Sequence, residues 1–257
     1  MIDSHCHLTS RELLPQIGAV LVRAEAAGVK EFVTIAADLA DAATALALAE
    51  TYTQVHVVCG IHPHQAGQAS ADWDRRLADL VERKDIHAVG EMGLDYHYDF
   101  ADRQVQRRVF ERQIELAAAA NKPIVIHCRE AHADVMAVLA HCGPARDVVF
   151  HCFTGTLREA EEILVRGYWI SLTGVVTFKR SDELRQVAKL IPEERLMIET
   201  DSPYLSPEPV RGVRPNEPSH LSYTAGCIAQ TRGLTVEALT RITTANTRRF
   251  FNLPERT

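Results

Sequence analysis

The chain begins Met1-Ile-Asp-Ser-His-Cys-His7, where an apolar start is followed by two histidines on either side of one residue. In a β-strand alternate side chains lie on the same face, so His5 and His7 point the same way. Two imidazoles on one face at a strand end can chelate a divalent cation. The stretch therefore predicts a strand that leads into a metal site, with a polar surface loop as the alternative.

Further short apolar segments alternate with helical patterns along the chain. Several are apolar throughout, such as Val55 to Val58 and Ile124 to Ile126, which is typical of strands buried on both faces of a parallel sheet. The predicted strands are 1–6, 31–37, 55–61, 86–91, 123–127, 147–152, 168–172 and 195–200. The predicted helices are 11–27, 41–53, 73–84, 103–121, 131–141, 156–166, 181–190 and 217–232, with a further helix at about 235–250.

The residues that end these strands decide between two fold classes. Strands that alternate with helices in an α/β chain fit a TIM-like (β/α)8 barrel, with a doubly wound open sheet as the competitor. Possible metal ligands end the first, fourth, fifth, sixth and eighth predicted strands. Only a closed barrel gives a reason for this, because it brings all strand ends together at one face. No linker or change in composition divides the chain, so we expect a single domain over 1–257.

Residues at the helix ends support the assignment. The expected N-caps are Asp41, Asp72, Thr156 and Thr235. Gly28 and Gly167 stand where a helix should stop.

Composition restricts the class of protein. A hydrophobic content of 46% and a charged content of 24% are those of an ordinary globular protein. The net charge of −6 argues against a long basic groove for nucleic acid, but not against a compact site that holds a phosphate through cations. Without a signal peptide or an apolar run of membrane-spanning length, we expect a cytoplasmic protein with no membrane partner and no obligate protein partner.

The six cysteines form no CxxC pair and no disulfide framework. Three of them directly follow a histidine, at Cys6, Cys128 and Cys152. We expect these thiols to be small core residues.

Glu91 ends the fourth predicted strand, between Gly90 and Gly93. Glycines on both sides favour a tight site where a ligand or cation comes close. A buried carboxylate needs a partner, and a carboxylate can bridge two cations. We therefore assign Glu91 as a bridging metal ligand, with a salt bridge or a helix cap as the alternative.

His127 ends Pro123-Ile-Val-Ile-His127, and His151 ends Val148-Val-Phe-His151. A satisfied core histidine is the usual interpretation of one such residue, but two at equivalent ends of successive strands favour ligation. Asp201 follows the last strand and is expected to bind metal and to act as a general base, with a turn into Ser202-Pro203 as the alternative. Glu199 is either a support for this site or part of an external salt bridge.

Candidates for substrate contact follow the strands. His62 is expected to touch substrate, whereas His64 is expected to be a loop residue because Pro63 bends the chain between them. Arg129 suits a phosphate oxygen, with a salt bridge to Glu130 or Asp134 as the alternative. Weaker candidates on loops are Asp95, Arg214, Asn216 and Glu217.

Together these segments resemble the TatD family of metal-dependent deoxyribonucleases, within the amidohydrolase-like barrel superfamily. The matching pieces are Asp3–Leu8, Gly60–His64, Val89–Tyr96, Pro123–Arg129, His151–Gly155, Glu199–Leu205 and Arg214–Pro218. The resemblance implies a dinuclear site. One divalent cation would be held by His5, His7, Glu91 and Asp201, and the other by Glu91, His127 and His151. None of the five lysines ends a predicted strand, so Glu91 takes the place of the carboxylated lysine that is frequent in the superfamily.

The resemblance implies a 3′→5′ exonuclease that hydrolyses phosphodiesters at single-stranded or frayed DNA ends, with Mg²⁺, Mn²⁺ or Zn²⁺ as the cations. The cations would activate a water, Asp201 would orient or deprotonate it, and Arg129 and His62 would hold the phosphate. One alternative is a metal-dependent hydrolase of a small-molecule ester or amide. The other, a non-catalytic nucleic-acid-binding protein, is disfavoured by the net charge and the 6% aromatic content.

Overall fold

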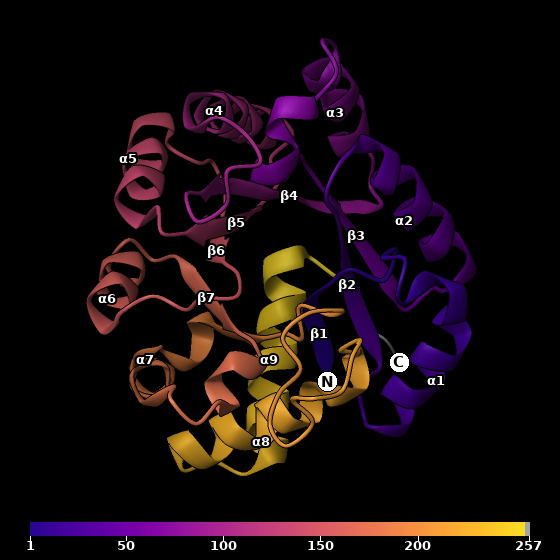
Figure 1. Cartoon of the computed structure of the whole chain (residues 1–257), viewed down its shortest axis with the longest axis vertical. Helices are drawn as coiled ribbons and strands as arrows, with labels where there is room; N and C mark the ends of the chain where they lie inside the picture. The colour runs from indigo at the N-terminus through magenta and orange to yellow at the C-terminus, as the bar shows by residue number, and fades with distance from the viewer. Residues whose placement is uncertain (255–257) are drawn as a thin grey trace. The chain divides into compact units, whose positions relative to one another are not determined.

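The computed structural model describes residues 1–254, in which strands alternate with helices (Figure 1). The strands are β1 Ile2–Cys6, β2 Glu31–Ala36, β3 Val55–Cys59, β4 Ile86–Asp95, β5 Ile124–Arg129, β6 Val148–Phe150, β7 Trp169–Leu172 and β8 Leu196–Ile198. The α-helices are α1 Ile17–Ala26, α2 Leu39–Thr51, α3 Trp73–Val81, α4 Arg103–Ala119, α5 His132–Cys142, α6 Leu157–Val165, α7 Asp182–Leu190, α8 Leu221–Arg232 and α9 Val236–Phe251. Short 3-10 helices are η1 Leu14–Gln16, η2 Pro63–Gln68, η3 Gly174–Thr177, η4 Glu193–Arg195 and η5 Pro218–His220.

The eight strands of the described chain form one sheet in the order of the sequence, from β1 to β8. The pairings β1–β2, β3–β4, β4–β5, β5–β6 and β7–β8 are parallel. The first and last strands are also neighbours, because the N–H of Asp201 donates to the carbonyl of His5 and the N–H of His7 donates to that of Ser202. The predicted TIM-like (β/α)8 barrel is thereby confirmed, and the doubly wound open sheet is excluded.

Packing divides the chain into two compact units. The first comprises residues 1–34 and the segment from Cys152 onward, and the second comprises residues 35–151. The expectation of a single domain over 1–257 stays a prediction, and residues 255–257 lie outside the described part. No helix within residues 1–254 has both the length and the apolar character that a membrane span requires.

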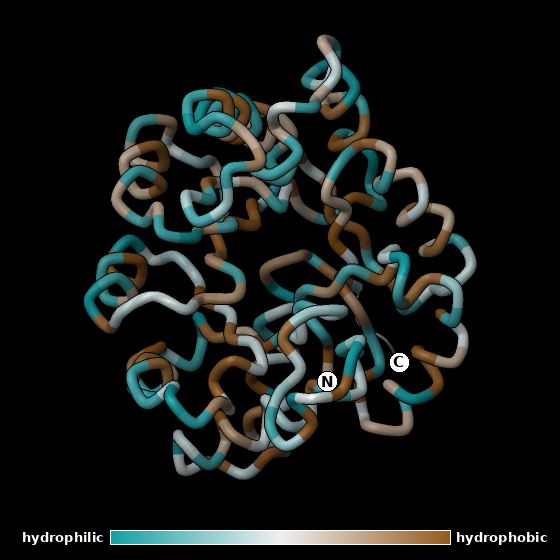
Figure 2. Tube along the Cα trace, in the orientation of Figure 1, coloured by the Kyte–Doolittle hydropathy of each residue, from teal (hydrophilic) through white to brown (hydrophobic). Residues whose placement is uncertain are grey.

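In the first unit, α9 packs against β1 and β8 (Figure 1). Trp169 of β7 also contacts α9, since its ring centroid lies 5.5 Å from that of Phe250, which in turn lies 4.8 Å from that of Phe251. All three side chains are buried. In the second unit, α4 packs against β4 through a buried face that includes Phe110 and Ile114. Hydrophilic and hydrophobic residues alternate along α4, as expected for a helix with one face in the core (Figure 2).

Strand β4 is longer than predicted, and its glycines explain why. It runs from Ile86 to Asp95, not to Glu91, and its register against β5 shifts between Val89 and Met92. Gly90 and Gly93 have φ values of 151° and 143°, and a Cβ there would lie 2.6 Å from the carbonyl oxygen of Val125 and 2.0 Å from that of His127, respectively. The glycines therefore serve the close approach of β4 to β5, whereas the sequence had indicated close approach of a ligand.

Other strand and helix ends also differ, and α1 begins at Ile17, six residues later than predicted. His151 lies just beyond β6, and Asp201 lies three residues beyond β8. The N-cap of α2 is Asp38, not Asp41: the Asp38 carboxylate accepts from the N–H groups of Ala40 and Asp41. Thr156 is the N-cap of α6, as expected, and forms a capping box with Glu159, while Thr235 caps α9.

Asp72 stands at the N-cap position of α3 but makes no capping hydrogen bond, because its side chain pairs with Ser70 and Arg75. Gly28 and Gly167 follow their helices with positive φ, as expected. Of the three cysteines that follow a histidine, only Cys6 is fully buried, whereas Cys128 and Cys152 are half-buried. The expectation of three core thiols was therefore wrong for two of them.

Replacement of Gly93 by alanine tests the β4–β5 contact. We expect Gly93→Ala to lower the free energy of unfolding by more than about 2 kcal/mol, because the methyl group collides with rigid backbone. The control is Gly143→Ala, at φ 63° with no atom within 4 Å of the added carbon, which should cost about 1 kcal/mol. Urea denaturation measures both, and equal losses would contradict the account.

Candidate metal centre

In the first unit, the ends of β1 and β8 bring together His5, His7 and Asp201, named here the β1–β8 cluster. Asp201 Oδ1 lies 3.5 Å from His7 Nε2 and 3.7 Å from His5 Nε2. Two ligand atoms with bonds of about 2.1 Å to one cation lie about 3.0–3.4 Å apart at octahedral or tetrahedral angles. The three side chains therefore fit a divalent cation with only a small adjustment.

Backbone hydrogen bonds between the strand ends set this geometry. Asp201 has φ 53°, a left-handed conformation that aspartate tolerates better than most residues. Its N–H donates to the carbonyl of His5 over 3.0 Å, and its carbonyl accepts from the N–H of Tyr204. Its side chain is 13% exposed, so solvent water can reach the carboxylate.

Glu199 supports the same region from inside. It is buried, and its Oε2 accepts from the hydroxyl of Ser171 at 2.5 Å and from that of Ser4 at 3.3 Å. Its Oε1 accepts from the N–H of Cys152 at 2.6 Å. The alternative of an external salt bridge for Glu199 is therefore wrong, and the carboxylate holds three strand ends of the first unit together.

Asp3 is a second buried carboxylate beneath this cluster. It accepts from the N–H of Thr200 at 2.9 Å and from the Thr200 hydroxyl at 2.5 Å. Burial raises the pKa of Asp3 to about 8, because it outweighs the opposing hydrogen bonds from Thr200. The folded protein thus favours the protonated carboxyl group near neutral pH.

This pKa predicts a pH dependence of stability. The unfolded pKa is about 3.9, so the contribution of Asp3 is fully present below about pH 4 and is lost as the pH rises to about 8. Relative to Asp3→Asn, which cannot ionise, the metal-free wild type should lose up to about 1.4 kcal/mol per pH unit in that window. Urea denaturation at a series of pH values measures the difference, and parallel curves would contradict the assignment.

In the second unit, the ends of β3, β4, β5 and β6 bring together a larger set, named here the β4–β5 cluster. Its members are His62, His64, Glu91, Asp95, His127 and His151. A single oxygen, Glu91 Oε1, lies 2.6 Å from His151 Nε2, 2.7 Å from His127 Nδ1 and 3.5 Å from His62 Nε2. Three imidazoles around one carboxylate form a donor set typical of a divalent cation. The two shorter distances are those of hydrogen bonds, and they lengthen to about 3.0–3.4 Å when a cation lies between the atoms.

Asp95 organises the other side of this cluster. Its Oδ2 lies 2.9 Å from Nε2 of both His64 and His127. Its Oδ1 accepts from the N–H groups of His97 and Tyr98. Burial raises the pKa of Asp95, but the hydrogen bonds from His127, His64 and Tyr98 outweigh it and hold the pKa well below its usual value.

The histidines of the cluster differ in their charge preference. Burial lowers the pKa of His127, but hydrogen bonds to Asp95 and Glu91 outweigh it and raise the pKa. Burial lowers the pKa of His62 to about 4 despite the attraction of Glu91. Burial alone would raise the pKa of Glu91. The attraction of His151 and His62 outweighs burial and holds the pKa of Glu91 well below its usual value. His62 thus favours the neutral imidazole, and Glu91 favours the ionised carboxylate.

Two residues that sequence reasoning placed on loops belong to the cluster. His64 was set aside because of Pro63, yet η2 returns its ring to Asp95. Asp95 is the last residue of β4, and only 1% of it is exposed. Its carboxylate holds other side chains of the cluster in place. The second His-x-His motif pairs two rings, since His62 Nδ1 accepts from the N–H of His64 and the ring centroids lie 4.4 Å apart. The contact of His64 with Asp95, however, depends on how η2 folds back.

Two of the predicted substrate contacts, Arg129 and Arg214, are exposed. Arg129 lies over the ring of Tyr98, 5.0 Å from its centroid. Within residues 1–254 it pairs with neither Glu130 nor Asp134, which contact His97 and Tyr96 instead. Arg214 is exposed on the segment after β8.

The weaker candidates after β8 have structural roles. The amide of Asn216 donates to the carbonyls of Thr200 and Tyr204, and Glu217 pairs with Arg23. These contacts fix the proline-rich segment 201–218 in place.

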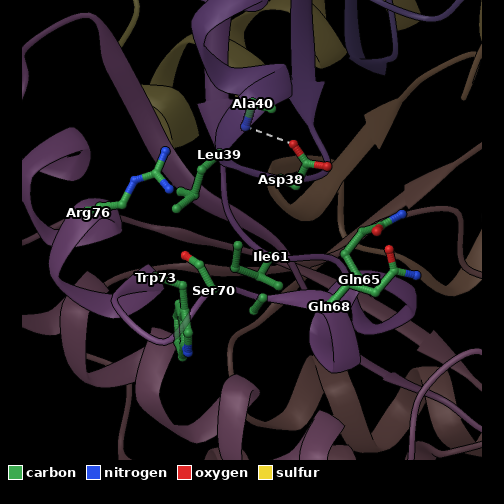
Figure 3. A pocket seen from close by; sticks show the side chains of 10 residues that line it. Asp38, Leu39, Ala40, Ile61, Gln65, Gln68, Ser70, Trp73 and Arg76 are labelled. Carbon is green, nitrogen blue, oxygen red and sulfur yellow. Dashed lines mark hydrogen bonds between the residues drawn. The ribbon is translucent and has the colours of Figure 1, made fainter.

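A cavity of about 230 Å³ lies against η2 in the second unit (Figure 3). Its lining includes Leu39, Ile61, Gln65, Gln68, Trp73 and Arg76, but none of the cluster histidines. Asp38 at its edge is already engaged as the N-cap of α2. The donor sets for a metal therefore lie outside this cavity.

The fold and the two clusters define a barrel hydrolase with histidine and carboxylate ligands at its strand ends. The profile of the TatD related DNase family matches residues 2–252, and the chain belongs to this family. As a member, it is a metal-dependent hydrolase of the TatD type.

Individual relatives agree with this family. The uncharacterized metal-dependent hydrolase YabD of Bacillus subtilis is 37% identical over 254 residues, which are 98% of this chain and 99% of that protein. The 3′-5′ ssDNA/RNA exonuclease TatD of Citrobacter koseri is 36% identical over 261 residues, with coverage of 98% and 99%. The crystal structure of YjjV, a TatD homologue from Escherichia coli K12, superimposes with a TM-score of 0.94 at 29% identity and covers 99% of this chain and 98% of its own.

Proposed function

We propose that the protein is a divalent-metal-dependent 3′→5′ exonuclease that acts on single-stranded or frayed DNA ends. The observation that carries the proposal is the buried Glu91 oxygen with three imidazole nitrogens within 3.5 Å. Relatives named as single-strand exonucleases, at 36% identity over almost the full chain, support this substrate class.

We propose two cations, one for each cluster. His5, His7 and Asp201 would hold one, and Glu91, His127 and His151 would hold the other, with Mg²⁺, Mn²⁺ or Zn²⁺ as the ion. The expectation that Glu91 is a ligand to both ions stays a prediction. When bound, the cations lower the pKa of a coordinated water and neutralise the charge of the phosphoryl group.

The side chains of the chain perform the remaining steps. Asp201 is reached by solvent, so its carboxylate can accept the proton of the attacking water. Asp95 keeps His127 in one orientation through its second ring nitrogen, which is how partners of metal-bound histidines usually act. His62 and the exposed Arg129 and Arg214 are the proposed contacts to the phosphate.

The Glu91→Gln variant tests the metal-dependent chemistry. We expect it to lower kcat/KM on 5′-labelled single-stranded DNA by more than about 100-fold, because loss of even an outer partner of a metal ligand costs 10- to 100-fold. Chelator-stripped protein should be inactive until a divalent cation is added, with products that shorten from the 3′ end. Glu162→Gln on α6 is the matched control and should behave as wild type. Full activity of Glu91→Gln would refute the proposal.

The Arg129→Ala variant tests the phosphate contact. We expect a 10- to 100-fold lower kcat/KM on DNA, as for a lost hydrogen bond to a charged group, while hydrolysis of the uncharged ester p-nitrophenyl acetate is unchanged. Arg129→Lys should recover part of the loss, and Arg158→Ala on α6 should have no effect. An equal loss on both substrates would show that Arg129 acts on the structure of the site and not on phosphate.

A further inference from the structure

The loop that follows β4 exposes two aromatic rings. Tyr98 is 41% and Phe100 is 61% exposed, although the chain as a whole has few aromatic residues. Their ring centroids are 5.4 Å apart and their planes differ by 30°. Exposed rings that lie close together in a short loop offer a surface on which a flat ligand can stack.

A histidine and an arginine complete this surface. The ring of His64 lies 4.7 Å from Phe100 and 5.5 Å from Tyr98. The guanidinium of Arg129 lies over Tyr98 and makes no ion pair within the described chain. We name the four side chains the stacking surface: His64, Tyr98, Phe100 and Arg129.

The loop is held in a fixed conformation. The carboxylate of Asp95 accepts from the N–H of Tyr98, and the amide of Gln106 donates to the carbonyls of Asp95 and Ala101. A Cβ on Gly67 of η2 would lie 3.4 Å from that of Ala101, so the loop packs against η2. The rings are thus placed before any ligand binds, which reduces the entropic cost of binding.

The stacking surface is continuous with the β4–β5 cluster. His64 belongs to both, since its Nε2 contacts Asp95 and its ring lies 4.4 Å from that of His62 and 6.0 Å from that of His127. One carboxylate, Asp95, fixes the cluster through Oδ2 and the loop through Oδ1. A ligand on these rings therefore lies directly beside the metal ligands.

We propose that the stacking surface binds an unpaired nucleobase of the substrate strand next to the scissile phosphate. The inference rests on the proposed function and names how the strand is held. Every base has a flat π-face, so stacking on Tyr98 and Phe100 is independent of sequence, and Arg129 supplies a positive charge for the adjoining phosphate. A base inside a duplex is already stacked and paired, which explains a requirement for single-stranded or frayed ends.

DNA binding without cleavage provides the test. Fluorescein-labelled single-stranded DNA is titrated in chelator with wild type and with Tyr98→Ala/Phe100→Ala, and anisotropy gives the Kd. We expect the double variant to bind 10- to 100-fold more weakly. The control is Tyr223→Ala on α8, which removes a ring of similar exposure, 38%, and should not change the Kd. Unchanged thermal unfolding shows that the variants are folded.

Substrates with one abasic position among the last three 3′ nucleotides locate the stacked base. At one position the lost base should weaken binding by wild type about tenfold but leave binding by the double variant unchanged. The inference is overturned if the double variant binds like Tyr223→Ala, or if no abasic position matters. If the surface binds DNA as proposed but no divalent cation supports cleavage, the proposed function fails while this inference stands.

Discussion

The second unit depends on one interaction, in which a single histidine of β5 contacts two carboxylates of β4. Glu91 and Asp95 both lie on β4, and His127 of β5 contacts one with each ring nitrogen. This is possible only because β4 runs unusually close to β5, at Gly90 and Gly93. The glycines, the carboxylates and the histidine therefore form one constraint, and a change to any of them alters the others.

Charge explains why these residues gather at a buried site. Glu91 and Asp95 are 2% and 1% exposed, and an isolated buried carboxylate is very costly. Imidazoles compensate the negative charge of each carboxylate, and a backbone N–H group adds to this at Asp95. In the first unit Asp201 faces two imidazoles in a similar way, while Glu199 is satisfied by hydroxyl groups and a backbone N–H. A carboxylate that faces imidazoles suits metal binding, whereas a carboxylate held by hydroxyl and N–H groups suits support of the strand ends.

The sequence predicted the barrel and the histidines and carboxylates that lie at its strand ends, because both follow from local periodicity. His5 with Asp201, and Glu91 with His127 and His151, meet as the strand ends required. The roles of His64 and Asp95 could not be predicted, because they depend on how η2 folds back and on the extension of β4 beyond Glu91. The purpose of Gly93 was also misjudged, since a contact to the backbone of a neighbouring strand leaves no local pattern.

Anomalous diffraction from a crystal of this protein soaked with Mn²⁺ tests the central claim most directly. We expect an anomalous peak within about 2.0–2.4 Å of Glu91 Oε1, with His127 and His151 nitrogens among the ligands. A second peak beside Asp201, His5 and His7 is expected in the same map. Strong peaks only at exposed carboxylates, with none beside Glu91, would contradict the assignment of a metal centre to these strand ends.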